Sequence, residues 1–140
     1  MRLIHLAVSA ALLAGCGSMS YQPVQEVDFA HMAADGCVKA GDRFTITAQI
    51  SSAYEQTIVL FDGADASRTL PVRLPEPGVG DKARGIVGTT RYETSRAKLL
   101  QLRETHTPVA VTMTCVDRGK APVADRFSFT EDGHRVDFEF

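Results

Sequence analysis

The sequence lacks the signatures of the common hydrolase and metal-site classes. Its 140 residues contain no G-x-S-x-G motif, no H-E-x-x-H motif and no Cys-x-x-Cys pair. The three histidines that follow residue 15 are His31, His106 and His134, and each falls in a different predicted element. We therefore predict a protein that is not an enzyme and that holds neither a metal ion nor a cofactor.

Long apolar runs and a strong net charge are also missing. The apolar stretch 3–14 is shorter than the roughly 20 residues that a membrane-spanning helix needs. The 15 basic and 17 acidic residues give a balance that argues against a general nucleic-acid binder. No repeat, low-complexity segment or internal linker divides the chain, so its length suits one ordinary domain.

The first sixteen residues have the layout of a secretory signal. Arg2 precedes an apolar run, and Leu13-Ala14-Gly15 stands immediately before Cys16. This ending resembles the lipobox of bacterial lipoproteins. The resemblance implies cleavage before Cys16, a diacylglycerol on its thiol, and an acyl chain such as palmitate on its new amino group. The alternative is a buried helix in which Cys16 is a core thiol.

The resemblance also implies where the protein is held. Several acyl chains form an essentially permanent anchor, because each buried CH₂ contributes about 0.8 kcal/mol and a single chain binds only marginally. No Asp follows Cys16, and in lipoproteins of the enterobacterial kind this implies transport to the outer membrane. We expect a signal peptide at 1–15, a lipidated cysteine and tether at 16–23, and one β-rich domain at 24–140, facing the periplasm.

Two cysteines, Cys37 and Cys115, are left once Cys16 carries the lipid. In an oxidising periplasm an isolated pair is typical of one disulfide bond. The bond would close a loop of 79 residues, both cysteines included, and stabilise the fold by roughly 4–5 kcal/mol before strain is subtracted. The alternatives are two separate buried thiols or a metal site, and no close His-x-x-His or Cys-x-x-Cys spacing supports the metal site.

Alternation of apolar and polar residues predicts a mainly β domain. The clearest strand covers 43–53, with one apolar face formed by Phe44, Ile46, Ala48 and Ile50. Three further strands are predicted at 58–61, 69–74 and 109–116. A C-terminal hairpin is predicted from 127–129 and 136–140, which flank an Asp-Gly turn.

Helical patterns are fewer. Residues 24–34 suit a short helix or turn, and a longer helix is predicted from Thr90 or Thr94 to about Thr105. Thr90 and Glu93 have the spacing of a capping box. Between the predicted strands and this helix, the glycine- and proline-rich stretch 75–88 predicts the longest loop, with 85–88 as a further short strand.

The order of these elements resembles the OB-fold, a small Greek-key barrel whose helix lies between the third and fourth strands. The resemblance covers element order only. It implies a small OB-like β-barrel with one helix at that place and an added C-terminal hairpin. Periplasmic proteins and lipoproteins of this size with this fold occur in bacterial envelopes. A small β-sandwich is the alternative architecture.

Basic residues are concentrated in the middle of the chain. Residues 68–103 carry eight basic and three acidic residues. A positive face built there would bind an acidic envelope protein, an anionic lipid head group or an anionic glycan. Acidic flanks could instead neutralise the segment within the fold, or it could be a solvated helix face. The candidate partner-binding residues are Arg84, Arg91, Arg96, Lys98 and Arg103.

Together these features favour a non-enzymatic binding or adaptor module in an envelope assembly, held at the membrane by its lipid. The alternative is an inhibitor or immunity lipoprotein that blocks a toxin or a cell-wall hydrolase by inserting the loop 75–88. The two hypotheses predict different partners for the same anchored domain.

Overall fold

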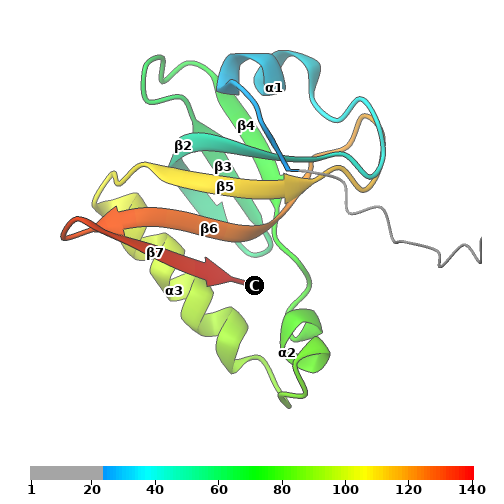
Figure 1. The fold of residues 1–140 in the computed structure, drawn as a ribbon, viewed down its shortest axis with the longest axis vertical. Coiled ribbons are helices and arrows are strands. Elements are labelled where there is room, and N and C mark those ends of the chain that lie inside the picture. Colours follow the sequence, from blue (N-terminus) through cyan, green and yellow to red (C-terminus); the bar gives the residue numbers. More distant parts are fainter. Residues whose placement is uncertain (1–23) are drawn as a thin grey trace, which may run out of the picture.

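The computed structural model describes residues 24–140. The predicted signal peptide, the predicted lipidation site Cys16 and the predicted tether lie outside the described residues. Within them, no helix is long and apolar enough to cross a membrane. The elements in chain order are β1 (Gln25–Glu26), α1 (Phe29–Asp35), β2 (Arg43–Tyr54), β3 (Thr57–Phe61), β4 (Thr69–Arg73), α2 (Val79–Ala83), α3 (Thr90–Glu104), β5 (Val109–Thr114), β6 (Val123–Glu131) and β7 (His134–Glu139) (Figure 1).

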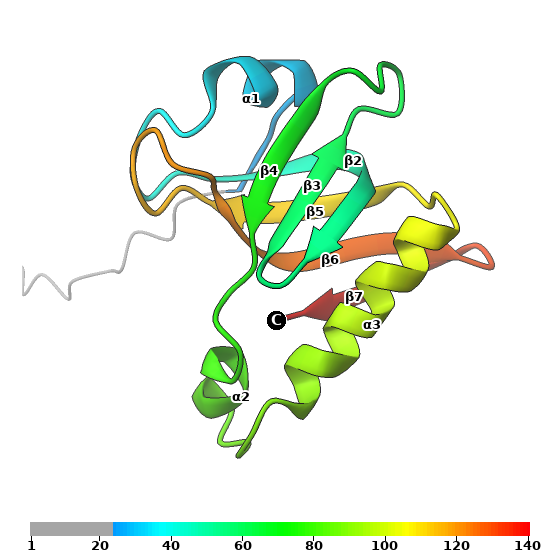
Figure 2. The same ribbon diagram turned by 180° about the vertical axis from the view of Figure 1, so that it is seen from behind.

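The seven strands form one mixed sheet, so the prediction of a mainly β domain is confirmed. The long strand β2 pairs with β5 along its first half and with β3 along its second half. The sheet curves until β4 meets β6, but these two strands share only one residue pair, Arg73 with Val123 (Figure 2). The sheet is therefore strongly bent without being a complete barrel.

The apolar faces predicted from alternation form the core. On β2, the side chains of Phe44, Ile46, Ala48 and Ile50 are all buried. Pro71 lies in the middle of β4, which pairs with β3 over its whole length but with β6 at a single position. Proline lacks an amide hydrogen, but it is tolerated there because no second ladder at Pro71 requires one.

An aromatic cluster joins the C-terminal hairpin to α3. The β6–β7 hairpin turns at Asp132 and Gly133, both with positive φ, as a two-residue turn requires. The rings of Phe127 and Phe138 stack across the hairpin with their centroids 5.2 Å apart. The last residue, Phe140, packs edge-on against Tyr92 of α3, also at 5.2 Å. The chain end is thus part of the core.

Three local predictions differ from the structure. The stretch 24–34 contains β1 as well as α1, and a two-residue strand is too short to show alternation. The predicted loop 75–88 contains the helix α2, and 85–88 is not a strand. The N-cap of α3 is Thr89 rather than Thr90, and its hydroxyl donates to the carboxylate of Glu93 at 3.0 Å.

Candidate functional site

The disulfide prediction is borne out. Cys37, just after α1, and Cys115, just after β5, are bonded, with their Cα atoms 5.4 Å apart and both side chains buried. Backbone bonds surround the link: Gly119 donates to the carbonyl of Cys37 at 2.8 Å, and Gly41 to that of Cys115 at 2.7 Å. The bond therefore fastens the entry to β2 to the exit from β5.

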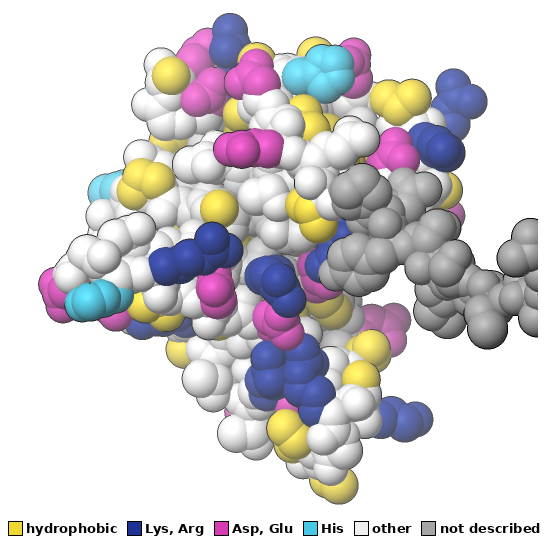
Figure 3. Space-filling model, viewed as in Figure 1, with side chains coloured by type: hydrophobic (Ala, Val, Ile, Leu, Met, Phe, Trp, Pro, Cys, Tyr) yellow, Lys and Arg dark blue, Asp and Glu magenta, His cyan; other side chains and the backbone are white. Residues whose placement is uncertain are grey.

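The strongest surface feature lies in residues 75–88, which we call the α2 segment. Seven large apolar side chains are exposed in residues 24–140, and three of them, Val79, Ile86 and Val87, belong to this segment. Val87 is 97% exposed. We call these three side chains the apolar tip. Apolar side chains are visible on the surface over the end of the molecule that carries α2 (Figure 3).

The α2 segment is fixed to the chain end. A Cβ atom on Gly80 would come within 2.5 Å of the carbonyl oxygen of Phe140, so only glycine allows this approach. Arg84 donates to the carbonyl of Gly80 at 2.9 Å. The amide of Ile86 donates to the carbonyl of Asp81 at 2.8 Å, which folds the end of the segment back onto α2. These contacts tie the backbone of the α2 segment to the chain end and to itself.

Asp81 lies on the inner side of α2. It is 2% exposed, and within residues 24–140 neither of its carboxylate oxygens has a hydrogen-bond partner. A buried carboxylate without a partner is unfavourable.

Glu139, next to the chain end, connects the sheet to the α2 segment and to α3. Its carboxylate accepts a hydrogen bond from Nε of Arg126 on β6 at 2.9 Å. It also pairs with Arg84 of the α2 segment and, at 3.5 Å, with Arg91 of α3. The hydroxyl of Ser95 donates to the backbone carbonyl of Glu139 at 2.7 Å. The hydrogen bond and charge of Arg126, aided by Arg84, hold the pKa of the Glu139 carboxyl below its usual value.

We expect Glu139→Gln to lower the free energy of unfolding by about 1–2 kcal/mol at pH 7, because a partly exposed set of charge-assisted hydrogen bonds is lost. The folded-state pKa is depressed, so this stabilisation is fully present above about pH 4.3, the ordinary pKa of glutamate. It disappears as the pH falls through the lower folded-state value. Urea denaturation at a series of pH values measures the difference.

Glu104→Gln is the matched control, because Glu104 is an exposed carboxylate on α3. It should change stability little at any pH. A Glu139→Gln difference that stays constant from pH 7 to pH 3 would contradict the role assigned to the charged carboxylate.

The five basic residues named from the sequence are mostly engaged within the domain. Arg84 and Arg91 bind Glu139, and Arg96 donates to the carbonyl of Glu55 in the β2–β3 turn. Lys98 lies 3.9 Å from the carboxylate of Glu131. Arg103, near the end of α3, has no ion-pair partner within residues 24–140. There its charge suits the negative end of the helix dipole.

The outward side of α3 is therefore not a positive face. Its exposed residues are neutral or acidic: Thr90, Glu93, Thr94, Ala97, Gln101 and Glu104. The basic residues of α3 flank this line: Arg91 and Lys98 pair with carboxylates elsewhere in the chain, and Arg96 donates to a backbone carbonyl. The arrangement favours neutralisation within the fold, and partner binding through these five residues stays a prediction.

The histidines do not form a site within the described part of the chain. Nδ1 of His31 lies 3.3 Å from Asp35 one turn along α1, while His106 follows α3 and His134 opens β7. No group of three or more His, Cys, Asp or Glu residues in 24–140 is arranged to hold a metal ion.

Comparison with known proteins finds no matching family model, no matching curated protein and no matching solved structure. The function of the domain is therefore inferred from its geometry. Sequence reasoning found the α2 segment as a loop but missed its apolar tip. The signal that could have revealed it is the presence of Val79, Ile86 and Val87 among glycines and charged residues, because aliphatic side chains grouped in a solvent-exposed loop often mark an interaction site.

Proposed function

We propose that this chain is a membrane-anchored periplasmic lipoprotein that acts as a non-enzymatic binding module, and that it docks a protein partner through the apolar tip. The observation that carries the proposal is the exposure of Val79, Ile86 and Val87 on a segment fastened to the core. A pre-organised apolar surface binds well because little conformational freedom is lost on association.

The anchor is proposed from the sequence Leu13-Ala14-Gly15-Cys16 and its resemblance to a lipobox. The absence of Asp after Cys16 supports the outer membrane as the site of anchoring. Cells grown with labelled palmitate should label the native chain and leave the Cys16→Ser variant unlabelled. Label on the variant would contradict lipidation at Cys16.

The proposed architecture is an OB-like barrel that carries two added strands. Its support is the circuit of pairings β2-β3-β4-β6-β5 back to β2. In chain order α3 lies between β4 and β5, the third and fourth of these five strands. The additions are β1, beside β2, and β7, beside β6. A β-sandwich is less well supported, because its two separate sheets do not match seven strands in one sheet.

The chemistry of the tip defines the partner surface. Three aliphatic side chains suit a shallow apolar pocket, and the neighbouring Lys82 suits an acidic rim around it. An acidic, apolar-centred pocket on an envelope protein is the expected counterpart.

Crosslinking in intact cells, followed by purification and mass spectrometry, tests the proposal. We expect Val79→Ser, Ile86→Ser and Val87→Ser together to reduce capture of the main partner at least about tenfold, since three aliphatic contacts are lost. The matched control changes Val38, Tyr54 and Val116, which are exposed apolar residues elsewhere. Full capture by a folded tip variant would reject the tip as the docking surface.

The charge hypothesis has a separate arm in the same experiment. Arg103→Glu reverses a basic residue that has no ion pair within residues 24–140, so it perturbs the fold least among the five candidates. Capture that is lost with Arg103→Glu and kept with the tip variant would move the docking surface to α3.

An inhibitor or immunity protein is the second candidate function. The fixed α2 segment with its exposed end favours it, because rigid loops suit insertion into an enzyme cleft. The identity of the captured partner decides between the two functions. A toxin or wall hydrolase whose activity falls at one-to-one stoichiometry would establish the inhibitor.

A further inference from the structure

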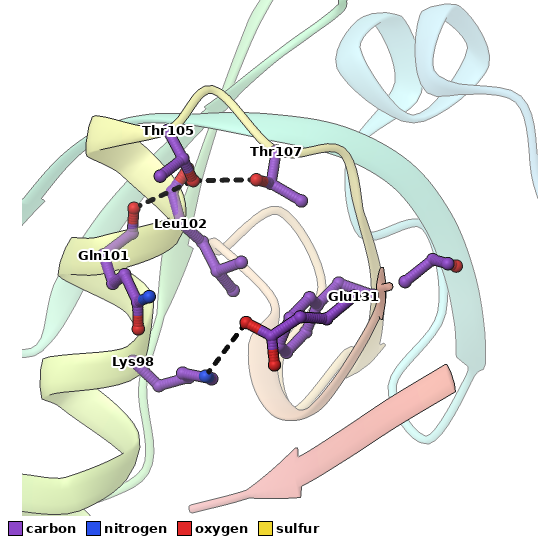
Figure 4. A pocket seen from close by; sticks show the side chains of 8 residues that line it. Lys98, Gln101, Leu102, Thr105, Thr107 and Glu131 are labelled. Atoms are coloured by element: carbon purple, nitrogen blue, oxygen red, sulfur yellow. Dashed lines mark hydrogen bonds and ion pairs between the residues drawn. The ribbon is translucent and has the colours of Figure 1, made fainter. Parts of the chain in front are cut away.

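A small cavity lies between the C-terminal part of α3 and β6 (Figure 4). Its volume is about 110 Å³. Residues from α3, the turn after it and β6 line the cavity: Lys98, Gln101, Leu102, Thr105, Thr107, Phe129, Thr130 and Glu131. It is less open than a surface dent, because the helix and the hairpin wall it on two sides.

Two opposite charges lie side by side at one edge of the cavity. The ammonium of Lys98 and the carboxylate of Glu131 are 3.9 Å apart, which is longer than the roughly 2.8 Å of a charge-assisted hydrogen bond. The Lys98 ammonium also lies 5.1 Å from the centre of the Phe129 ring. Each charged group therefore keeps bonding capacity that a ligand can use.

The rest of the lining is divided between apolar and hydroxyl groups. Leu102 and Phe129 are buried and supply an apolar wall. Beyond them, the hydroxyls of Thr105 and Thr107 bond to each other at 2.7 Å, and Thr105 also bonds to the carbonyl of Gln101 at 3.0 Å. Figure 4 shows Lys98 and Glu131 on one side of Leu102 and the threonines on the other.

We infer that this cavity binds a free α-amino acid with a short aliphatic side chain. The ligand carboxylate pairs with Lys98, the ligand ammonium with Glu131, and the side chain contacts Leu102 and Phe129. A simple anion is disfavoured by Glu131 and a simple cation by Lys98, so the pair selects a ligand that carries both charges.

The size of the cavity sets an upper limit on the side chain. An apolar cavity of about 150 Å³ accepts benzene, which has six heavy atoms. Alanine also has six heavy atoms, and the cavity of about 110 Å³ is open on one side. Alanine therefore fits, whereas the ring of phenylalanine does not. The cavity contains none of the residues of the apolar tip, so a test of amino-acid binding is independent of the proposed docking function.

Saturation-transfer NMR on the full-length protein in detergent micelles tests the inference, with L-alanine as the probe. We expect a dissociation constant on the order of 1 mM, given the few atoms of the ligand. N-acetyl-L-alanine lacks the ammonium and L-alanine amide lacks the carboxylate, so each should bind about tenfold more weakly. L-phenylalanine should not bind at this site.

Lys98→Met and Glu131→Gln should each weaken L-alanine binding about tenfold, because each removes one charge and keeps the shape of the side chain. Arg103→Met is the matched control on the same helix, outside the cavity, and should leave binding unchanged. Equal signals from L-alanine and its two derivatives, or no signal from L-alanine at millimolar concentration, would overturn the inference. The cavity would then be a packing gap beside a surface ion pair.

Discussion

Replacing Phe140 with Ala is expected to lower the free energy of unfolding by about 3–5 kcal/mol, the range for truncating a buried Phe. Chain ends are usually dispensable, but this one is 6% exposed. Its ring meets those of Tyr92 and Phe127 at 5.2 and 5.6 Å, so the substitution opens a cavity between α3 and the sheet. Urea denaturation followed by circular dichroism measures the loss.

Phe61→Ala is the matched control, because Phe61 is a half-buried ring at the end of β3, outside the aromatic cluster. Phe61→Ala should lower the free energy of unfolding markedly less than Phe140→Ala does. Phe140→Leu should recover more than half of the loss, since it refills most of the volume. A loss below about 1 kcal/mol for Phe140→Ala would show that the chain end is not part of the core.

The same substitution should weaken partner capture at temperatures where the variant is folded. The carbonyl of Phe140 lies against Gly80, and Glu139 holds Arg84, so a loosened chain end releases the α2 segment. A mobile apolar tip must be ordered on binding, which opposes association. For the same reason, an affinity tag for the capture experiment belongs elsewhere than at the C-terminus.

The sequence predicted those parts of the fold in which one face of a strand is buried. Alternation on β2 and the Asp-Gly turn of the β6–β7 hairpin are local patterns, and both are present. The cysteine pair was also predictable, because in the oxidising periplasm that the sequence predicts, two remaining cysteines are typical of one disulfide. These features depend on residues near one another or on covalent chemistry.

The candidate site was harder to predict because long-range contacts shape it. The helix α2 lies in a stretch rich in glycine and proline, and the contact that fixes it comes from Phe140, 60 positions beyond Gly80. The charge of the basic segment alone left open whether it forms a positive face, is neutralised by acidic flanks or is a solvated helix face. The carboxylates that pair with its Arg84, Arg91 and Lys98, Glu139 and Glu131, lie outside the segment. Counting the charges within one segment of the sequence does not reveal such long-range ion pairs.

Replacing Cys37 and Cys115 together with Ala is expected to lower the free energy of unfolding by about 3–5 kcal/mol. The bond spans 78 positions of the sequence, so its loss gives the unfolded chain a large gain in entropy. Both cysteines are buried, which adds a small packing loss. Urea denaturation measures the free energy of unfolding of the oxidised chain, the reduced chain and the double variant. The reduced chain and the double variant should have similar values, well below that of the oxidised chain.

The disulfide and the chain end hold different parts of the domain. Cys37 and Cys115 lie at the α1 side of the sheet, whereas Phe140 and Glu139 hold α2 and α3 at the other side. Their effects on stability should therefore add. Under conditions where the Cys37→Ala/Cys115→Ala variant remains folded, partner capture through the apolar tip should be retained, in contrast to Phe140→Ala. Equal loss of capture in both variants would show that the tip depends on global stability rather than on its attachment to the chain end.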